Sequence, residues 1–296
     1  MLLSIVIPVY NSEKTIGRLV ESLFEELNTL NFEIILVNDG SKDASEAVCE
    51  NLTVGFRNVT LVSLRKNFGE FNAVMCGFNH AIGDFCVVID DDFQNPPTEI
   101  IKLLQTAQHG GFDVVYSFYA QKQHSIFRNV GSWLANAVAT WLLDKPKNLY
   151  LSSFKIIKQE LVQEIIKYQG PFPYIDALIF RATTHVGRVQ VQHVKRVDGR
   201  SGYSLKKLIS LFLVILFCHS AKPLRLLLVL GFGLIAFGFF GAFLFPNATM
   251  SLPQHLFLVG LQFLGMGVLG EYLGKMFLQQ SGIPQFVIKK IVKSYD

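Results

Sequence analysis

The sequence predicts an α/β fold with a doubly wound, mostly parallel sheet, followed by two long apolar helices. Two observations predict this fold. Short apolar runs alternate with helical patterns along the chain as far as Ile89, which is typical of repeated strand–helix units. Charged residues are frequent up to about Arg200 and nearly vanish between Leu226 and Glu271. The chain of 296 residues is therefore expected to combine a globular domain with a membrane segment.

The strand–helix repeat lies in the N-terminal part of the chain. Apolar runs predict strands at four places: 3–9, 33–37, 59–64 and 85–89. Helical patterns separate them, beginning near residues 13, 44 and 70. Weaker patterns predict four later elements: strands at 111–118, 154–157 and 186–194 and a helix at 126–143. Because the carboxyl ends of parallel strands share one edge of a sheet, the loops after the first four strands should form the rim of a ligand site.

The fourth strand ends abruptly in a cluster of polar side chains. Asp90, Asp91 and Asp92 follow the buried run Val87 to Ile89, and Gln94 comes two residues later. Asp90 and Asp92 should point the same way because side chains alternate along extended backbone. Mg²⁺ or Mn²⁺ bound to a phosphate needs a few hard oxygen ligands of this kind. A solvated acidic turn would also fit this cluster, but polar loops after the other strands favour a metal site.

Polar or glycine-containing loops also follow the first three strands. Their candidate residues are Pro8, Tyr10 and Asn11 after the first strand, Asp39, Gly40 and Ser41 after the second, and Arg65 and Asn67 after the third. Gly40 allows a tight backbone turn beside a ligand, and the Asp39 carboxylate can accept a hydrogen bond from a nucleobase. Taken alone, the pattern around Asp39 is more often a turn with a helix cap, and a solvated side chain is an equal alternative for Arg65.

Two apolar segments, at about 224–245 and 255–278, predict a transmembrane hairpin. With a rise of about 1.5 Å per residue, each is long enough to cross a hydrocarbon core of about 30 Å. Lysine and arginine flank the outer ends of the pair, and the connecting loop has no charge, so both ends are predicted to face the cytoplasm. A soluble pair of core helices is the competing interpretation.

The predicted organisation of the chain follows from these patterns. Residues 1–202 form a cytosolic domain, 203–222 an amphipathic segment along the membrane interface, 223–280 the hairpin and 281–296 a cytosolic tail. The expected location is the inner (cytoplasmic) membrane, with two spans. Four glycines on the second span, from Gly265 to Gly274, would permit close helix packing and predict a possible homo-oligomer.

Composition excludes several other classes. The four cysteines have no paired spacing, which indicates reduced thiols in a cytosolic domain. The seven histidines are scattered, which argues against a zinc site. The net charge of +4 is modest and is concentrated near the apolar segments, so an anionic membrane surface is expected as a partner and a nucleic acid is not.

The motifs, in order and spacing, resemble those of family 2 glycosyltransferases of the polyprenyl-phosphate type. Five lie in the globular part: Pro8-Val9-Tyr10-Asn11, Asp39-Gly40-Ser41-Lys42-Asp43, Arg65-Lys66-Asn67-Phe68-Gly69, Asp90-Asp91-Asp92-Phe93-Gln94-Asn95-Pro96-Pro97 and the run from Arg196 to Tyr203. Two lie in the hairpin, at 222–225 and 265–272, and resemble bactoprenol glucosyltransferases and undecaprenyl-phosphate aminoarabinose transferases. The family also includes dolichol-phosphate mannose synthases. The resemblance covers nearly the whole chain.

The resemblance implies a Rossmann-like GT-A fold and a reaction. That reaction is the inverting transfer of one sugar from a nucleotide sugar, expected to be a UDP-sugar, to polyprenyl (undecaprenyl) phosphate, with Mg²⁺ or Mn²⁺ as cofactor. Donor-nucleotide binding is implied for Pro8, Tyr10, Asn11, Asp39, Gly40, Ser41, Arg65, Asp90 and Asp91. Asp90, Asp92 and Gln94 are the implied metal ligands, and Arg128, Lys122, Arg196 and Ser201 the implied acceptor-phosphate ligands. Asp90, Asp92 and Arg128 are the implied catalytic residues.

The chain also departs from the family pattern. Asn38 and Tyr119 replace an expected aspartate and arginine, with Lys122 as a stand-in for the latter, and residues 146–160 lack an aspartate that many relatives carry. A processive polysaccharide synthase is a competing interpretation, but its Gln-x-x-Arg-Trp motif is absent from the sequence. The sequence also leaves room for a non-catalytic, nucleotide-sugar-binding membrane scaffold and for a transferase with another acceptor.

Overall fold

The structure, a computed structural model, describes the whole chain except residues 120–138, 148, 193, 195–204, 245–251 and 295–296. The chain forms two compact units. The first, here called the sheet unit, contains Met1–Gly202 and Pro284–Asp296, and the second, here called the helical unit, contains Tyr203–Ile283. The C-terminal segment therefore belongs to the same unit as the N-terminus.

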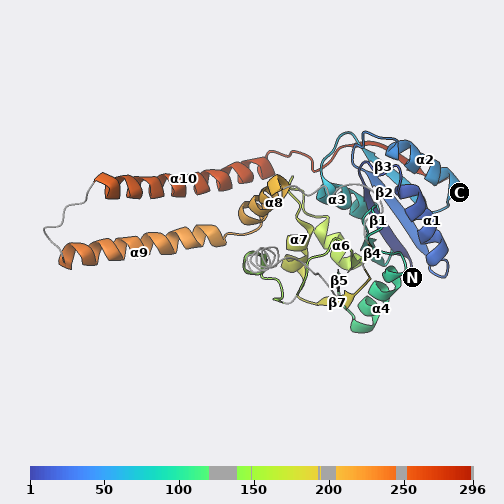
Figure 1. Cartoon of the computed structure of the whole chain (residues 1–296), viewed down its shortest axis with the longest axis horizontal. Coiled ribbons are helices and arrows are strands. Elements are labelled where there is room, and N and C mark those ends of the chain that lie inside the picture. Colours follow the sequence, from blue (N-terminus) through green and yellow to red (C-terminus); the bar gives the residue numbers. More distant parts are fainter. Residues whose placement is uncertain (120–138, 148, 193, 195–204, 245–251, 295–296) are drawn as a thin grey trace. The chain divides into compact units, whose positions relative to one another are not determined.

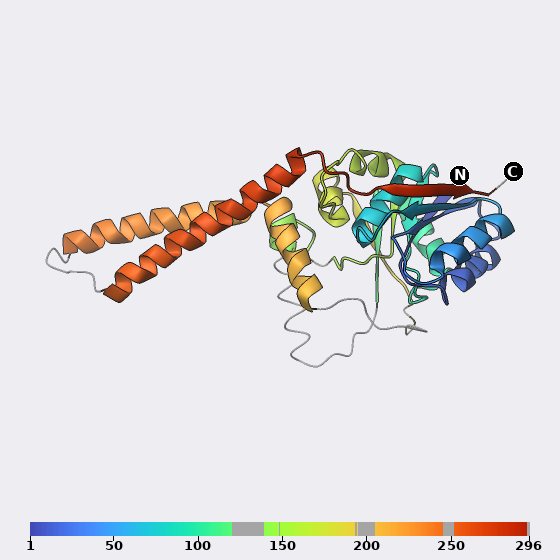
Figure 2. The ribbon, with the colours of Figure 1, turned by 90° about the horizontal axis from the view of Figure 1, so that it is seen from above.

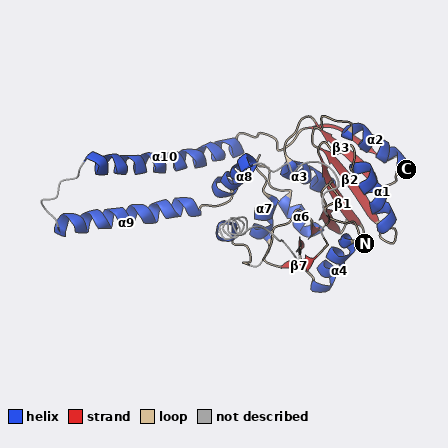
Figure 3. Ribbon diagram, viewed as in Figure 1, coloured by secondary structure: helices blue, strands red, loops and turns tan. Residues whose placement is uncertain are grey.

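The sheet unit is built on one mixed sheet of eight strands, coloured red in Figure 3. Their order across the sheet is β7-β5-β6-β4-β1-β2-β3-β8. The strands are β1 (Leu3–Val9), β2 (Phe32–Asn38), β3 (Val59–Leu64), β4 (Phe85–Val88), β5 (Val114–Phe118), β6 (Lys155–Lys158), β7 (Val186–Gln190) and β8 (Ile288–Lys293). Strands β1 to β4 are mutually parallel, β5 and β7 are parallel to each other, and β6 and β8 are antiparallel to their neighbours.

Helices cover both faces of this sheet, as a doubly wound fold requires (Figure 1). One face packs against α1 (Ile16–Glu26), α2 (Ser45–Gly55) and α4 (Glu99–Gly110). The opposite face packs against α3 (Glu70–His80), α6 (Gln159–Ile165) and α7 (Ile175–Ala182). Each face has its own hydrophobic cluster, so strands in the middle of the sheet are apolar at most positions.

Strand β1 shows how the sequence produces this arrangement. Ile5 and Ile7 lie in one hydrophobic cluster and Val6 in the other, because successive side chains of a strand point to opposite faces. All three side chains are fully buried. A strand that is covered on both faces favours apolar residues at successive positions, which explains the run Ile5 to Ile7 in the sequence.

The predicted fold class is confirmed, with differences at two strands. The seven strands predicted in the globular part are present, although β5 begins and β7 ends a few residues inside the predicted ranges. The segment 281–296 contains β8, which pairs with β3 at the edge of the sheet and appears in dark red in Figure 2. Most of the helix predicted at 126–143 lies outside the described residues, and residues 139–143 are helical.

The helical unit consists of α8 (Leu205–Cys218), α9 (Lys222–Leu244) and α10 (Leu252–Gln280). Helix α10 contacts both of the others. The hydroxyl of Tyr272 on α10 lies 3.1 Å from the carbonyl oxygen of Leu216 and 2.7 Å from that of Ser220, and its ring meets Phe217 edge-on at 5.2 Å between centroids. These contacts hold α10 against the junction between α8 and α9.

The membrane hairpin stays a prediction. Among the described residues, no helix taken alone has both the length and the apolar composition expected of a membrane span. One bent pair of helical segments, Phe212–Cys218 and Lys222–Gly238, meets both conditions together, with an angle of 72° at the break. Helices α9 and α10 occupy the two segments in which the sequence predicts spans.

Candidate active site

The loops after β1 and β2 are joined by reciprocal hydrogen bonds. The backbone N–H of Asn11 donates to Oγ of Ser41 over 3.1 Å, and the backbone N–H of Lys42 donates to Oδ1 of Asn11 over 2.8 Å. Asn11 has a φ of 55°, a left-handed conformation that asparagine tolerates better than most residues. Two predicted donor-binding residues, Asn11 and Ser41, therefore hold each other in place, and Tyr10 beside them is 43% exposed.

Asp39 joins the loop after β2 to the loop after β3. Its carboxylate is 2% exposed and accepts hydrogen bonds from the backbone N–H groups of Phe68 (2.7 Å) and Gly69 (2.8 Å), one on each oxygen. Burial raises the pKa of Asp39 above its ordinary value, although the two N–H groups act in the opposite direction. The predicted contact of Asp39 with a nucleobase stays a prediction.

Gly40 permits the close approach of these two loops. Its φ is 63°, and a Cβ atom at this position would lie 2.5 Å from the carbonyl carbon of Lys66 and 2.6 Å from the nitrogen of Asn67. Both neighbours are backbone atoms, which cannot move aside as a side chain can. Glycine is required here both for the backbone conformation and for the space that it leaves.

The three consecutive aspartates point in different directions. Asp90 accepts a hydrogen bond of 2.5 Å from Oγ of Ser153, which lies just before β6. Asp91 accepts from the backbone N–H of Tyr10 (3.2 Å) and from the hydroxyl of Ser12, both in the loop after β1. The chain leaves β4 at Val88 and turns at Asp91, so the neighbouring aspartates meet different partners. Asp91 therefore ties the loop after β4 to the loop after β1, whereas Asp90 is tied to the segment before β6. The predicted ligand roles of Asp90 and Asp92 stay predictions.

The surroundings of Asp91 change its acidity. Burial raises the pKa of its carboxyl to about 6, and the negative charges of Asp90 and Asp92 act in the same direction. Hydrogen bonds from Ser12 and Tyr10 oppose this shift. Three adjacent carboxylates are thus costly to ionise together, and a divalent cation would relieve their repulsion.

The chain turns sharply after Asp92. Asp92 is 9% exposed, and its Oδ1 accepts a hydrogen bond of 3.0 Å from the backbone N–H of Gln94. Phe93 between them has a φ of 60°. The carbonyl oxygen of Gln94 in turn accepts from the N–H of Val194, 3.0 Å away. This turn fixes the backbone of the predicted metal ligands Asp92 and Gln94.

The donor atoms around this turn fit a magnesium or manganese ion that is shared with a phosphate. Asp90 and Asp92 offer carboxylate oxygens and Gln94 an amide oxygen, which are hard ligands. In the part of the chain that the structure describes, no group of three or more His, Cys, Asp or Glu side chains is arranged to hold a metal. Such an ion commonly completes its ligand shell with water and with substrate phosphate oxygens.

The remaining predicted site residues divide into two groups. Pro8 lies on β1, in register with Val37, and the backbone N–H of Arg65 donates to the carbonyl oxygen of Val287 over 2.9 Å. The four predicted acceptor ligands lie outside the described residues: Lys122, Arg128, Arg196 and Ser201. Their roles stay predictions.

Sequence reasoning missed several residues that position the site. Ser12 and Ser153 donate to Asp91 and Asp90, and neither belongs to a motif that marks it. Ser153 reaches Asp90 because β6 is antiparallel to β4 with Val88 opposite Lys155, so the register continued by two residues places Ser153 opposite Asp90. An antiparallel register between segments so far apart leaves no local signal in the sequence. Tyr119, in place of an expected arginine, donates to Oδ1 of Asn95 over 2.8 Å.

Comparison with known proteins agrees with this geometry. A family model described as glycosyl transferase family 2 matches residues 4–172. Undecaprenyl-phosphate 4-deoxy-4-formamido-L-arabinose transferases of Proteus mirabilis and Yersinia enterocolitica are 33% and 34% identical to the chain. Each alignment covers 98% of this chain and 93% of the relative.

A likeness to solved structures supports the fold. Crystal structures of glucosyl-3-phosphoglycerate synthase from Mycobacterium tuberculosis, one of them with Mn²⁺, UDP and glucosyl-3-phosphoglycerate, align with a TM-score of 0.56 at 20% identity. That alignment covers 74% of this chain and 79% of the other. The GT-A, Rossmann-like fold is thereby confirmed for the sheet unit. On the family match and the full-length relatives, the chain belongs to glycosyltransferase family 2 and is a glycosyltransferase.

Proposed function

We propose that this protein transfers a single sugar from a UDP-sugar to undecaprenyl phosphate at the cytoplasmic face of the inner membrane, with inversion at the anomeric carbon. The observation that carries this proposal is the extent of the similarity. The family model ends at residue 172, whereas relatives named for an undecaprenyl-phosphate acceptor align over 98% of the chain, which includes the helical unit. The likeness thus includes the part of the chain expected to meet a lipid.

The donor is proposed to bind across the carboxyl ends of β1, β2, β3 and β4. Hydrogen bonds of Asn11, Ser41, Asp39 and Asp91 connect these loops, so their backbone is positioned before a ligand arrives. Preorganisation of this kind lowers the entropic cost of binding. Tyr10 is exposed beside these loops and can stack on a base, while Arg65 adds positive charge for a diphosphate.

Asp90, Asp92 and Gln94 are proposed to hold a Mg²⁺ or Mn²⁺ ion. When bound, such an ion would supply positive charge next to the departing nucleoside diphosphate. Ser153 keeps the Asp90 carboxylate oriented, and the Gln94 backbone N–H does the same for Asp92. Both carboxylates are thus restrained before any ion binds.

The proposed mechanism assigns no residue as a catalytic base, because the acceptor is itself a nucleophile. A phosphate monoester has a second pKa of about 6, so near neutral pH it is largely a dianion and already a nucleophile. The protein then needs to bring two anionic groups together and to align the attacking oxygen with the anomeric carbon. Arg128, with Lys122, Arg196 and Ser201, is proposed to hold the acceptor phosphate. A single displacement inverts the anomeric configuration.

The test measures release of UDP from a panel of UDP-sugars by the detergent-purified, full-length protein. Undecaprenyl phosphate and Mn²⁺ are each added or omitted, and an Asp92→Asn variant serves as the control. Release that requires the lipid, the ion and Asp92 is the expected result. Binding of UDP without lipid-stimulated release from any donor would overturn the proposal and favour a different acceptor or a non-catalytic scaffold.

A further inference from the structure

We propose that the C-terminal strand β8 is a positioning element of the donor-nucleotide site. Lys289 and Lys290 hold helix α2, and the backbone next to β8 holds the loop after β3, so that the two loops around Asp39 stay together. This inference rests on the proposed function, because it concerns the same donor site. It assigns a role in donor binding to a segment that is separated from that site by the whole helical unit in the sequence.

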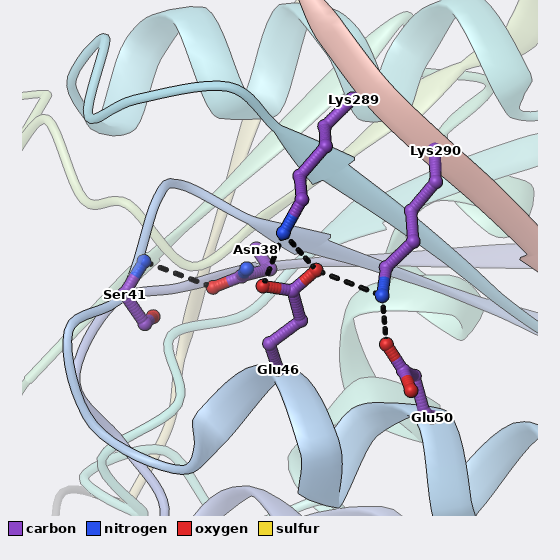
Figure 4. Close-up of polar contacts among 6 residues, drawn as sticks. All are labelled: Asn38, Ser41, Glu46, Glu50, Lys289 and Lys290. Carbon is purple, nitrogen blue, oxygen red and sulfur yellow. Dashed lines mark hydrogen bonds and ion pairs between the residues drawn. The ribbon is translucent and has the colours of Figure 1, made fainter.

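A bulge in β8 explains why two consecutive lysines act on one helix. The antiparallel register with β3 runs from Thr60 opposite Lys293 to Ser63 opposite Lys290, and then jumps to Leu64 opposite Ile288. Two residues of β8, Lys289 and Lys290, therefore lie opposite the single residue Ser63 of β3. In a regular strand their side chains would point to opposite faces, but a bulge changes this alternation. Figure 4 shows both ammonium groups converging on Glu46.

The ion pairs connect β8 to the first two turns of α2. Nζ of Lys289 lies 3.1 Å from Oε1 of Glu46, and Nζ of Lys290 lies 3.0 Å from the same atom. Lys290 also contacts Glu50, one turn farther along α2. Burial of Glu46 raises its pKa, but the hydrogen bonds from Lys290 and Lys289 outweigh this, and the pKa lies below its ordinary value.

Helix α2 in turn carries the loop after β2. The helix begins at Ser45, directly after that loop, and the carboxylate of Asp43 accepts hydrogen bonds from the N–H (3.0 Å) and the hydroxyl (2.6 Å) of Ser45. The loop is closed internally by the N–H of Ser41, which donates to Oδ1 of Asn38 over 3.2 Å (Figure 4). A shift of α2 would therefore move this loop.

The same C-terminal segment also holds the loop after β3. The carbonyl oxygen of Val287 accepts a hydrogen bond of 2.9 Å from the N–H of Arg65, the first residue of that loop. Three and four residues later, the backbone N–H groups of Phe68 and Gly69 donate to Asp39. The side chain of Gln285 donates to the carbonyl oxygen of Tyr168 over 2.6 Å and anchors the start of the segment in the sheet unit. The segment thus contacts α2, which follows the loop that contains Asp39, and also the loop after β3, which donates hydrogen bonds to Asp39.

The lysines also neutralise an acidic helix face. Without them, Glu46 and Glu50 would leave two negative charges on the helix that follows the loop around Asp39. Negative charge on an element that borders the proposed site of an anionic nucleotide weakens its binding, and the effect decreases with salt. The role assigned to Lys289 and Lys290 therefore predicts a salt-dependent change in affinity for the donor nucleotide.

The test compares three variants of the full-length protein. The first is Lys289→Gln with Lys290→Gln, and the second is Lys289→Arg with Lys290→Arg, which keeps both charges. The third is the control Lys293→Gln, on the same strand, for which the described part of the chain shows no ion pair. Isothermal titration with UDP in the presence of Mn²⁺ gives Kd, and turnover assays give KM for the donor and kcat separately.

The Gln pair is expected to bind UDP about threefold to tenfold more weakly, because each exposed ion pair contributes little by itself. KM should rise by the same factor with kcat unchanged, and the Arg pair and Lys293→Gln should bind like the wild type. In 1 M NaCl the difference between the Gln pair and the wild type should nearly disappear. A loss of binding that persists in high salt would indicate a general folding defect and overturn the inference.

Two further outcomes separate this inference from the proposed function. If the wild type binds no UDP with Mn²⁺ present, the donor site itself is wrong and both proposals fall. If the wild type binds UDP and the Gln pair binds it equally well, only the role of β8 is overturned.

Discussion

The two units of this chain use the same kinds of apolar side chain in opposite ways. In the sheet unit, Ile5, Ile7 and Val6 are fully buried between helices. In the helical unit, Phe232, Ile235 and Phe237 on α9 are 71%, 70% and 79% exposed. An exposed apolar surface of this extent is typical of a site that contacts another protein or a membrane. The sheet unit supplies its own core, whereas the helical unit depends on surroundings that we propose to be lipid.

The largest expected effect is on catalysis, because the proposed metal ligands lie in the sheet unit. Asp92→Asn removes a proposed metal ligand, and kcat/KM is expected to fall by more than about 100-fold, because electrostatic stabilisation of the leaving group is lost. The melting temperature and the amount of protein in the membrane fraction should not change. The matched control is Asp84→Asn, at the opposite end of β4, which should retain activity. If the Asp92→Asn variant were as active as the wild type, the proposed role of Asp92 as a metal ligand would be refuted.

The exposed face of α9 offers a direct test of the proposed lipid contact. Ile235→Lys places a charge in the middle of the helix, at a cost of about 2.5–3.5 kcal/mol if the helix lies in a bilayer. The variant should be depleted from carbonate-washed membranes. The matched control is Val54→Lys on α2, where the replaced side chain is 81% exposed in the sheet unit. Equal membrane retention of the two variants would contradict the contrast between the units.

Gly40, at which the loop after β2 approaches the loop after β3, is expected to matter for stability. Gly40→Ala combines a left-handed backbone with a clash against the backbone of Lys66, and the free energy of unfolding should fall by about 1–3 kcal/mol. UDP binding should weaken as well. Gly55→Ala is the control, because nothing lies within 4 Å of a Cβ at the end of α2. The role of Gly40 would be refuted by two variants of equal stability in urea denaturation.

A smaller effect is expected at Ser153, whose hydroxyl orients Asp90. Ser153→Ala should lower kcat/KM by about tenfold, the scale of lost contacts to metal ligands. Raising the Mn²⁺ concentration should recover part of the activity, and Ser153→Thr should retain most of it because the hydroxyl is kept. Ser153→Ala with an unaltered Mn²⁺ dependence would show that the hydrogen bond to Asp90 is not needed.

The smallest effect is a pH dependence of the link between α2 and β8. The pKa of Glu46 is lower in the folded state than in the unfolded state, so its stabilisation is fully present above the unfolded pKa of about 4.3 and is lost as the pH falls through the folded pKa. Glu46→Gln should therefore be less stable than the wild type at pH 7, by less than about 1 kcal/mol, and the difference should be smaller at pH 3. Urea denaturation at both pH values checks this, and a constant difference would contradict it.

Much of the candidate site could be predicted from the sequence because its residues follow strands directly. The alternation of side chains predicts Asp90 and Asp92 on one side and Asp91 on the other; in the structure each of the three has a different hydrogen-bond partner, and a shared side for Asp90 and Asp92 stays a prediction. The sequence also places Asp39 near a nucleobase, but its two oxygens accept hydrogen bonds from Phe68 and Gly69. The sequence of the loop after β2 does not reveal these backbone partners, since a buried carboxylate can accept hydrogen bonds from a nucleobase or from backbone N–H groups.

The sequence by itself determined the strand–helix alternation, the polar loops after the first four strands and the contrast between the two units. Each of these follows from the spacing of apolar and polar residues within a short segment, which local backbone geometry converts directly into structure. Only the tertiary structure decided which distant segments meet. Ser153 and Asp90 are 63 residues apart, and Lys290 and Glu50 are 240 apart. Such contacts depend on strand order and register across the whole sheet, which no short pattern contains.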